Sequence, residues 1–451
     1  MKDKHITDMT KGSPTFLILR FALPLLFGNV FQQFYSMVDS MIVGNYVGSN
    51  ALAAVGTCGS TSFLFFSLSA GLATGISILV SQYFGANDEK QVRNTIGNAT
   101  YVLLSASLFV SILSYILAPA IFHLLKVPAN ILPDSITYMR TSCFGIIFIA
   151  AYNGVAGVLR ALGDSKTPLY FLIISSFVNV GLDLFFVLVL HLGVFGVALA
   201  TVISQVVSAV TCMIYAYHKV SYFRLSRDEW KLKPSIVIRS FTLGTPIALQ
   251  NSMIAVSCMA LQGVVNSFGT TVMAAYTVTG RVEQIVQQGY GSLSAALTTY
   301  AGQNQGAGRA DRVRKGYWRS TWMALVFSLC LIPVFYLLGE RIIGIFVKDA
   351  PEVIVMGAKA LRITSLAYFA LGMIYVPRAV LNGCGDTGFA LLNGITEVIC
   401  RIGFSLILIQ IPWLSYWSIW VTTILTWVTT AAVCIIRYAR GKWELKSICE
   451  N

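Results

Sequence analysis

Apolar residues in this chain fall into long runs that are separated by short polar segments. One bilayer crossing needs about 20 mostly apolar residues, and twelve runs reach that length. They cover residues 15–43, 51–82, 94–122, 134–160, 167–190, 194–217, 236–266, 271–303, 317–347, 353–380, 387–411 and 415–438. The pattern predicts twelve transmembrane helices, and the longest runs imply tilted helices.

The composition agrees with a multi-pass membrane protein. Of 451 residues, 56% are hydrophobic and only 11% are charged, whereas a soluble domain has about 25% charged residues. This balance excludes a soluble enzyme, a secreted disulfide scaffold and a disordered chain. The number of cysteines, nine, is odd, and no two of them form a C-x-x-C motif. We therefore expect neither a disulfide framework nor a zinc site.

The net charge of +13 is placed unevenly along the chain. Lys and Arg residues, Arg160 among them, gather in the two termini and in the even-numbered loops, counted from the loop after the first predicted span. The odd-numbered loops hold few. The positive-inside rule therefore predicts cytoplasmic termini and a location in the cell membrane. Because topology explains these scattered charges, we expect a lipid bilayer as partner and no nucleic acid.

The chain repeats itself after about 222 residues. Gln82-x-x-Gly85-Ala86 aligns with Gln303-x-x-Gly306-Ala307, and Gly163-Asp164 aligns with Gly385-Asp386. Each half holds six predicted spans, so both halves insert with the same orientation, as parallel repeats in transporters do. We expect a six-helix lobe over 1–217, a cytoplasmic linker over 218–239 and a second lobe over 240–451, with the ligand in a V-shaped cleft between the lobes.

These features resemble the multidrug and toxic compound extrusion (MATE) family. The resemblance rests on the two six-helix halves, on the two Q-x-x-G-A loops and on the sequence V-L-R-A-L-G-D-S-K-T-P at 158–168, and its closest branch is the bacterial DinF-like one. It implies a secondary antiporter that exports bulky, often cationic organic compounds. The export would be driven by inward flux of H+ or Na+, through alternating access.

Two acidic residues lie inside apolar runs, where a charged side chain costs about 2.5–3.5 kcal/mol and needs a reason to be there. Asp39 lies in the first predicted span, on one helical face with Gln32 and Tyr35. Asp183 lies in the fifth span, one turn after Asn179. Both spans run outward, so we expect both acids in the outer half of the membrane.

Thr201, in the sixth span, is predicted at a similar depth. Two neighbouring carboxyls in a low dielectric favour proton binding, whereas carboxylate, amide and hydroxyl oxygens could instead hold Na+. The resemblance implies ion coupling too, because Asp39, Asn179, Asp183 and Thr201 match the coupling positions of the family's N-lobe. A structural role, with each aspartate hydrogen-bonded to a neighbouring helix, is the alternative. The sequence leaves H+ and Na+ open, and we favour H+.

The second half offers fewer intramembrane charges. Glu397 and Arg401 lie four residues apart in one predicted span, and we expect a structural ion pair. Glu283 is a weaker candidate for contact with a cationic substrate, and Gln287 follows it by one turn. Another branch of the MATE family couples through an acid in the first helix of this lobe, where this chain has Gln250, which argues against coupling there.

Aromatic, sulfur and amide side chains are candidates for the wall of a permissive cleft, since such groups adapt to flat cations. The candidates are Phe31, Gln32, Tyr35, Tyr152, Gln250, Met253, Glu283, Gln287 and Tyr375. Ordinary packing is the alternative for each aromatic. We expect small organic cations or other xenobiotics as substrates, no cofactor, and a monomer.

Missing motifs limit the mechanism further. The sequence has no G-x-x-x-x-G-K-[ST] loop for ATP, no H-E-x-x-H and no potassium-type filter. A membrane-embedded enzyme would need a cluster of nucleophiles or metal ligands, and none is visible, so no catalytic residue is predicted. A lipid-linked oligosaccharide flippase of the same superfamily is the nearest alternative. Such flippases tend to have cationic cavities, whereas we expect acids in this cavity.

Overall fold

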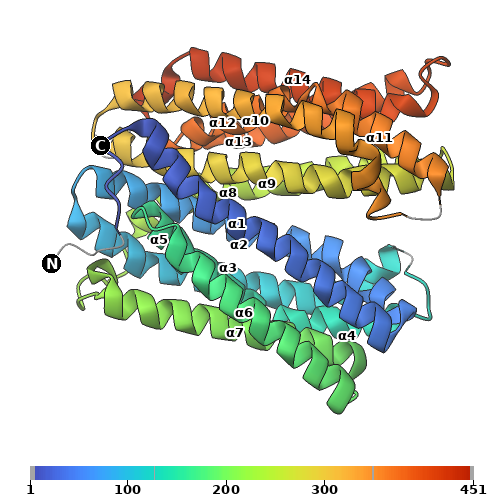
Figure 1. Cartoon of the computed structure of the whole chain (residues 1–451). Helices are drawn as coiled ribbons and strands as arrows, with labels where there is room; N and C mark the ends of the chain where they lie inside the picture. Colours follow the sequence, from blue (N-terminus) through green and yellow to red (C-terminus); the bar gives the residue numbers. More distant parts are fainter. Residues whose placement is uncertain (1–5, 126, 348–349, 447–451) are drawn as a thin grey trace. The chain divides into compact units, whose positions relative to one another are not determined.

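The computed structural model describes residues 6–125, 127–347 and 350–446, and these residues are helical almost throughout (Figure 1). Four lysines of the termini and loops lie outside the described residues, namely Lys2, Lys4, Lys126 and Lys348, and so does Cys449. The other eight cysteines are free thiols. The all-helical membrane fold predicted from the sequence is therefore the observed one.

The first half of the chain forms seven α-helices. They are α1 (Pro14–Ile42), α2 (Ser49–Gly85), α3 (Glu89–Leu124), α4 (Leu132–Cys143), α5 (Ile146–Ala161), α6 (Lys166–Leu184) and α7 (Gly193–Lys219). Two π-helical turns, Val43–Val47 and Phe185–Val189, extend α1 and α6. A short 3-10 turn, Ser221–Phe223, follows α7.

The second half repeats the order of long helices. They are α8 (Pro234–Asn266), α9 (Thr270–Gly306), α10 (Ala310–Gly344), α11 (Pro351–Ser365), α12 (Tyr368–Gly383), α13 (Gly388–Leu408) and α14 (Ser418–Ala439). Short 3-10 turns, Ser415–Trp417 and Lys442–Leu445, flank α14.

Two predicted spans are bent pairs of helices. α4 and α5 meet at 45°, and α11 and α12 meet at 51°, where the sequence predicts single helices over 134–160 and 353–380. At the first bend, Gly145 lets α7 approach, because a Cβ there would lie only 2.0 Å from Gln205 Oε1. Nothing comparable in the sequence marks the second bend.

Nine helices of the described residues are long and apolar enough to cross a membrane, and the two bent pairs raise the number to 11. α9 completes the twelve predicted spans by its length of 37 residues. It falls outside that set because it carries Arg281, Glu283 and several glutamines. Its polarity is the first indication that the interior of the second half is not purely apolar.

The chain divides into two compact units. Unit 1 holds Leu23–Ala248 together with the described residues that end at Asp8, and unit 2 holds Met9–Ala22 and the described residues from Leu249 onward. The first part of α1 thus belongs to unit 2, and the first part of α8 belongs to unit 1. Both divisions fall within two residues of the repeat-related prolines Pro24 and Pro246, which lie inside α1 and α8.

Small residues bring α2 and α8 together within unit 1. A Cβ on Gly71 would lie 2.5 Å from the Ala248 Cβ, and one on Gly75 would lie 2.6 Å from the Gly244 backbone nitrogen. Each helix therefore presents two small residues spaced by four, the small-xxx-small pattern that allows close packing of membrane helices. The backbones touch where any larger side chain would separate them.

We expect Gly75→Val to lower the thermal unfolding midpoint in detergent, because the new side chain must push α8 away, and overpacking costs about 1–3 kcal/mol. Gly56→Val is the matched control, since Gly56 lies on the same helix with no atom within 4 Å of the added Cβ. Equal midpoints for the two variants would contradict this packing.

The repeat-related Gly-Asp turns have diverged. In the first half, Asp164 Oδ1 accepts hydrogen bonds from the backbone N–H groups of Lys166 and Thr167, both at 3.0 Å, and so caps the start of α6. In the second half, Asp386 instead accepts from the Arg437 guanidinium, with Nε at 2.8 Å and Nη2 at 2.9 Å. One repeat position thus serves helix capping in one unit and an ion pair in the other.

Candidate functional site

Two carboxyl groups meet inside unit 1. Asp39 on α1 and Asp183 on α6 lie close enough to interact electrostatically, and each has a buried carboxyl oxygen without a hydrogen-bond partner. Asp183 is fully buried, and Asp39 is half-buried. An ionised carboxylate has only acceptor atoms, so two carboxyls can share a hydrogen bond only when at least one carries a proton. Two neighbouring carboxyls of this kind can hold a shared proton.

The Asn179 amide ties this pair to the neighbouring helices. Asn179 is fully buried on α6, four residues before Asp183, and we assign its orientation from the hydrogen-bond network. The amide nitrogen donates to Asp183 Oδ2 at 3.0 Å and to the Tyr35 hydroxyl, and the amide oxygen accepts from the Thr201 backbone N–H at 3.1 Å. Helices α1, α6 and α7 thus meet at one amide.

Thr201 and Tyr138 complete the network. The Thr201 hydroxyl donates to the Val197 carbonyl oxygen at 3.0 Å, and Tyr138 on α4 lies close to Thr201, Asp39 and Asp183. Sequence reasoning missed Tyr138, because a lone tyrosine near the outer end of a span looks like an ordinary interfacial residue. The structure thus brings all four predicted coupling residues together with Tyr35 and Tyr138, in what we call the carboxyl network.

Both acids precede local distortions of their helices. The π-helical turn Val43–Val47 begins four residues after Asp39, and the turn Phe185–Val189 begins two residues after Asp183. π-Helical turns inside longer helices are frequent at functional sites. The turns also contribute to a cluster of buried valines, with partly buried Tyr138 packed against it. Apolar side chains therefore adjoin the carboxyl network.

A cavity of about 530 Å³ lies within unit 1. This volume falls within the range of ligand pockets, about 300–1,000 Å³. One face each of α1, α5, α6 and α7 lines it, with residues spaced by three or four along every helix. Tyr35 and Thr201 belong both to its wall and to the carboxyl network.

The charge of the cavity wall differs from our expectation. No aspartate or glutamate lines the cavity, and Arg160, in the last turn of α5, is its one charged residue. The sequence placed Arg160 among the loop cations, because it lies next to the end of an apolar run. Other polar wall residues were also missed, among them Asn29, Asn153 and Gln205.

Four of the predicted substrate residues lie on α1 and α5 in unit 1. Gln32, Tyr35 and Tyr152 line the cavity, and the Tyr152 hydroxyl donates to the Pro168 carbonyl oxygen at 2.8 Å. Phe31 does not line the cavity. Its ring packs against Phe177, with the centroids 6.0 Å apart, as expected for ordinary packing.

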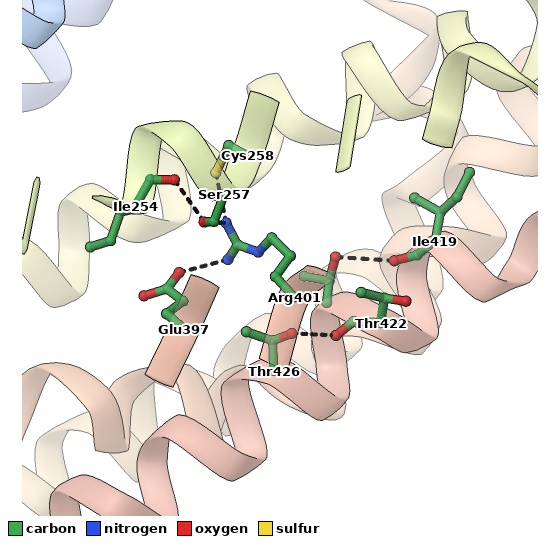
Figure 2. A network of polar contacts seen from close by, with 9 residues as sticks. Ile254, Ser257, Cys258, Glu397, Arg401, Ile419, Thr422 and Thr426 are labelled. Carbon is green, nitrogen blue, oxygen red and sulfur yellow. Dashed lines mark hydrogen bonds and ion pairs between the residues drawn. The ribbon is translucent and has the colours of Figure 1, made fainter. Parts of the chain in front are cut away.

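In unit 2, Glu397 and Arg401 form an ion pair on α13, with Arg401 Nη2 at 2.6 Å from Glu397 Oε1 (Figure 2). Arg401 Nη1 also donates to Ser257 Oγ at 2.9 Å and to Cys258 Sγ at 2.7 Å on α8. Both charged side chains are buried. The pair therefore joins two helices of unit 2, and its geometry is that of a structural link.

The remaining predicted residues of unit 2 are dispersed. Glu283 on α9 lies near Thr364 of α11, and its Oε1 has no hydrogen-bond partner. Gln287 is half-buried one turn later. Other candidates pack elsewhere in the unit, with Gln250 and Met253 against Gly394, and Tyr375 stacked on Tyr290 with centroids 6.2 Å apart.

The described residues contain no group of three or more His, Cys, Asp or Glu side chains that could hold a metal ion. The predicted Na+ site would need oxygen atoms from Asp39, Asn179 and Asp183. The orientation of the Asn179 amide is an assignment from the hydrogen-bond network, and the opposite orientation turns its oxygen toward Asp183.

Comparison with known proteins gives a consistent family assignment. A family model described as MatE matches the chain twice, over residues 24–185 and 246–407. The two matches start 222 residues apart and end 222 residues apart, which is the repeat spacing predicted from the sequence.

Relatives and solved structures agree. "Probable multidrug resistance protein YpnP" of Bacillus subtilis is 27% identical over 97% of both chains. "Probable multidrug resistance protein NorM" of Thermotoga maritima is 23% identical over 96% of this chain and 93% of that protein. A structure described as "Outward-facing conformation of a multidrug resistance MATE family transporter of the MOP superfamily" has the same fold, with a TM-score of 0.92 at 21% identity over 99% of both chains. Since the two family matches together span more than half of its residues, the chain belongs to the MatE family of multidrug efflux transporters.

Proposed function

We propose that this protein is a secondary antiporter that exports organic compounds in exchange for inward H+, by alternating access of two lobes. The observation that carries the proposal is that Tyr35 and Thr201 belong both to the carboxyl network and to the cavity wall. A change of protonation at the network therefore acts directly on two groups that a guest in the cavity would contact. Such shared contacts are what couples two binding equilibria.

Proton exchange follows from the donors and acceptors of the network. With one proton shared, Asp39 and Asp183 can hydrogen-bond to each other and so hold α1 against α6. Loss of that proton leaves two acceptor-only carboxylates side by side, which repel each other. This repulsion favours either separation of α1 from α6 or the uptake of a new proton. Protonation would thus switch the packing of unit 1.

The proposal has a direct test in proteoliposomes that receive a fluorescent dye on the outside, ethidium in one set and the carboxylate-bearing rhodamine 110 in another. Vesicles with an acidic lumen should accumulate dye against its gradient, because outward H+ flux drives dye inward through transporters of suitable orientation. Vesicles loaded with Na+, with equal pH inside and outside, should not accumulate dye. If neither the H+ gradient nor the Na+ gradient drives accumulation of dye, the antiport proposal is wrong. If only the Na+ gradient drives it, Na+ and not H+ is the coupling ion.

We retain the other features of the sequence interpretation as parts of the same proposal. They are lobes at 1–217 and 240–451 with a linker between them, both termini in the cytoplasm, insertion in the cell membrane as a monomer, and no cofactor and no catalytic step. The multidrug resistance names of the relatives favour export of xenobiotics over the flipping of lipid-linked oligosaccharides.

A further inference from the structure

We propose that the cavity of unit 1 binds the anionic group of its guest, a carboxylate-bearing aromatic compound, on Arg160. This inference rests on the proposed function and specifies its substrate class. It departs from the expectation of organic cations as the principal guests.

Arg160 is a cation without an acidic partner. The described residues contain no ion pair of the half-buried Arg160 and no hydrogen bond from its guanidinium, whereas the buried Arg401 has both. The titratable groups that act on Arg160 most strongly are the Tyr152 phenol and the Cys212 thiol, and both groups are neutral at pH 7 in their ordinary state. The positive charge of the cavity wall is therefore uncompensated.

The rest of the wall supplies neutral polar groups and apolar surface. Ser175 and Ser204 donate their hydroxyl protons to backbone carbonyl oxygens of their own helices, at 2.9 Å and 2.8 Å. Their oxygens can still accept a hydrogen bond from a guest, but these hydroxyls have no proton left to donate. Leu169 and Leu172 of α6 add apolar surface. A guest with one anionic group on a flat apolar body fits this distribution.

The carboxyl network does not neutralise Arg160. Asp39 and Asp183 lie outside the cavity wall, and they interact with each other. Arg160 is the one charged residue among those that line the cavity, and the assigned Asn179 amide donates to Asp183 on the network side. The guest cavity is therefore positive on balance.

Charge decides which guests such a cavity accepts. A guanidinium forms charge-assisted, often bidentate hydrogen bonds with a carboxylate, about twice as strong as neutral ones. An organic cation in the same space would meet a like charge in a low dielectric, which costs several kcal/mol in comparable interfaces. The difference favours anionic or zwitterionic aromatics over simple cations.

The test compares two dyes that differ only at the carboxyl group, namely rhodamine 110, with a free carboxylate, and its methyl ester, rhodamine 123. Equilibrium binding to the full-length protein in lipid nanodiscs is measured by fluorescence polarisation at pH 8, without any ion gradient. The wild type should bind the free acid about tenfold more tightly than the ester, which corresponds to one charge-assisted contact. Arg160→Gln should bring the two affinities within about twofold, and Arg160→Lys should keep part of the preference.

Arg140→Gln is the matched control, because Arg140 lies on α4 outside the cavity wall, with its guanidinium over the Tyr115 ring at 4.9 Å. This variant should keep the wild-type preference, and a thermal unfolding midpoint confirms that each variant is folded. The proposal is overturned if the wild type binds the ester as well as the acid, if it binds neither dye, or if folded Arg160→Gln retains the preference. Because no gradient is present, these outcomes are independent of whether the protein is an antiporter.

Discussion

Asp39→Asn should stop export without preventing folding. The amide of the variant can still hydrogen-bond Asp183, but it cannot gain or lose a proton at physiological pH. The exchange of one ion for one guest would then lose its switch. We expect the initial rate of gradient-driven dye transport in proteoliposomes to fall by about tenfold or more, in line with the usual strength of coupling between two sites.

The matched control for this variant is Asp134→Asn. Asp134 lies in the first turn of α4, outside the carboxyl network, and the same change from acid to amide there should leave the transport rate near the wild-type value. Both variants should elute as monodisperse protein with unchanged unfolding midpoints. Full transport by a normally inserted Asp39→Asn protein would remove Asp39 from the coupling site.

The second large effect is expected on stability, at the ion pair of unit 2. Arg401→Met leaves the Glu397 carboxylate buried without its 2.6 Å partner, and breaking a buried pair on one side costs about 3–5 kcal/mol. We expect a clear decrease in the thermal unfolding midpoint of the detergent-solubilised protein. The same variant also removes the hydrogen bonds to Ser257 and Cys258 on α8.

The double variant Glu397→Leu/Arg401→Met supplies the control. It removes both charges, so no unpaired ion remains, and replacement of a buried pair by apolar residues is often neutral or stabilising. Its midpoint should recover most of the loss. An Arg401→Met midpoint equal to that of the wild type would mean that the pair contributes no stability.

The architecture could be predicted from the sequence because the bilayer imposes a simple rule. Each crossing needs a long apolar run, and repeated motifs such as Gln82-x-x-Gly85 and Gln303-x-x-Gly306 identify the duplication. The bends at Gly145 and Leu366 could not be predicted in the same way, since they interrupt runs that stay apolar throughout. α9 differs in the other direction, because it is a spanning-length helix with polar side chains. The protein interior tolerates these side chains, and a single sequence does not show which helices lie in that interior.

The candidate site was only partly predictable. Polar residues at helical spacing in an apolar run mark an inward face, which is why Asp39, Asn179 and Asp183 could be grouped before the structure was known. Arg160 follows no such rule, because a cation at the end of a span satisfies the positive-inside pattern whether it faces water or a cavity. Tyr138 likewise has no distinguishing neighbour on its own helix.

The central claim is that the carboxyl network exchanges a proton for a guest, and counterflow tests it most directly. Vesicles without any imposed ion gradient receive dye on the outside, and a pH-sensitive dye in the lumen records proton movement. In wild-type vesicles, entry of the guest should drive H+ outward and make the lumen more alkaline, and Asp39→Asn vesicles should show neither change. Guest entry without opposite ion movement, or an unchanged response in folded Asp39→Asn protein, would contradict the claim.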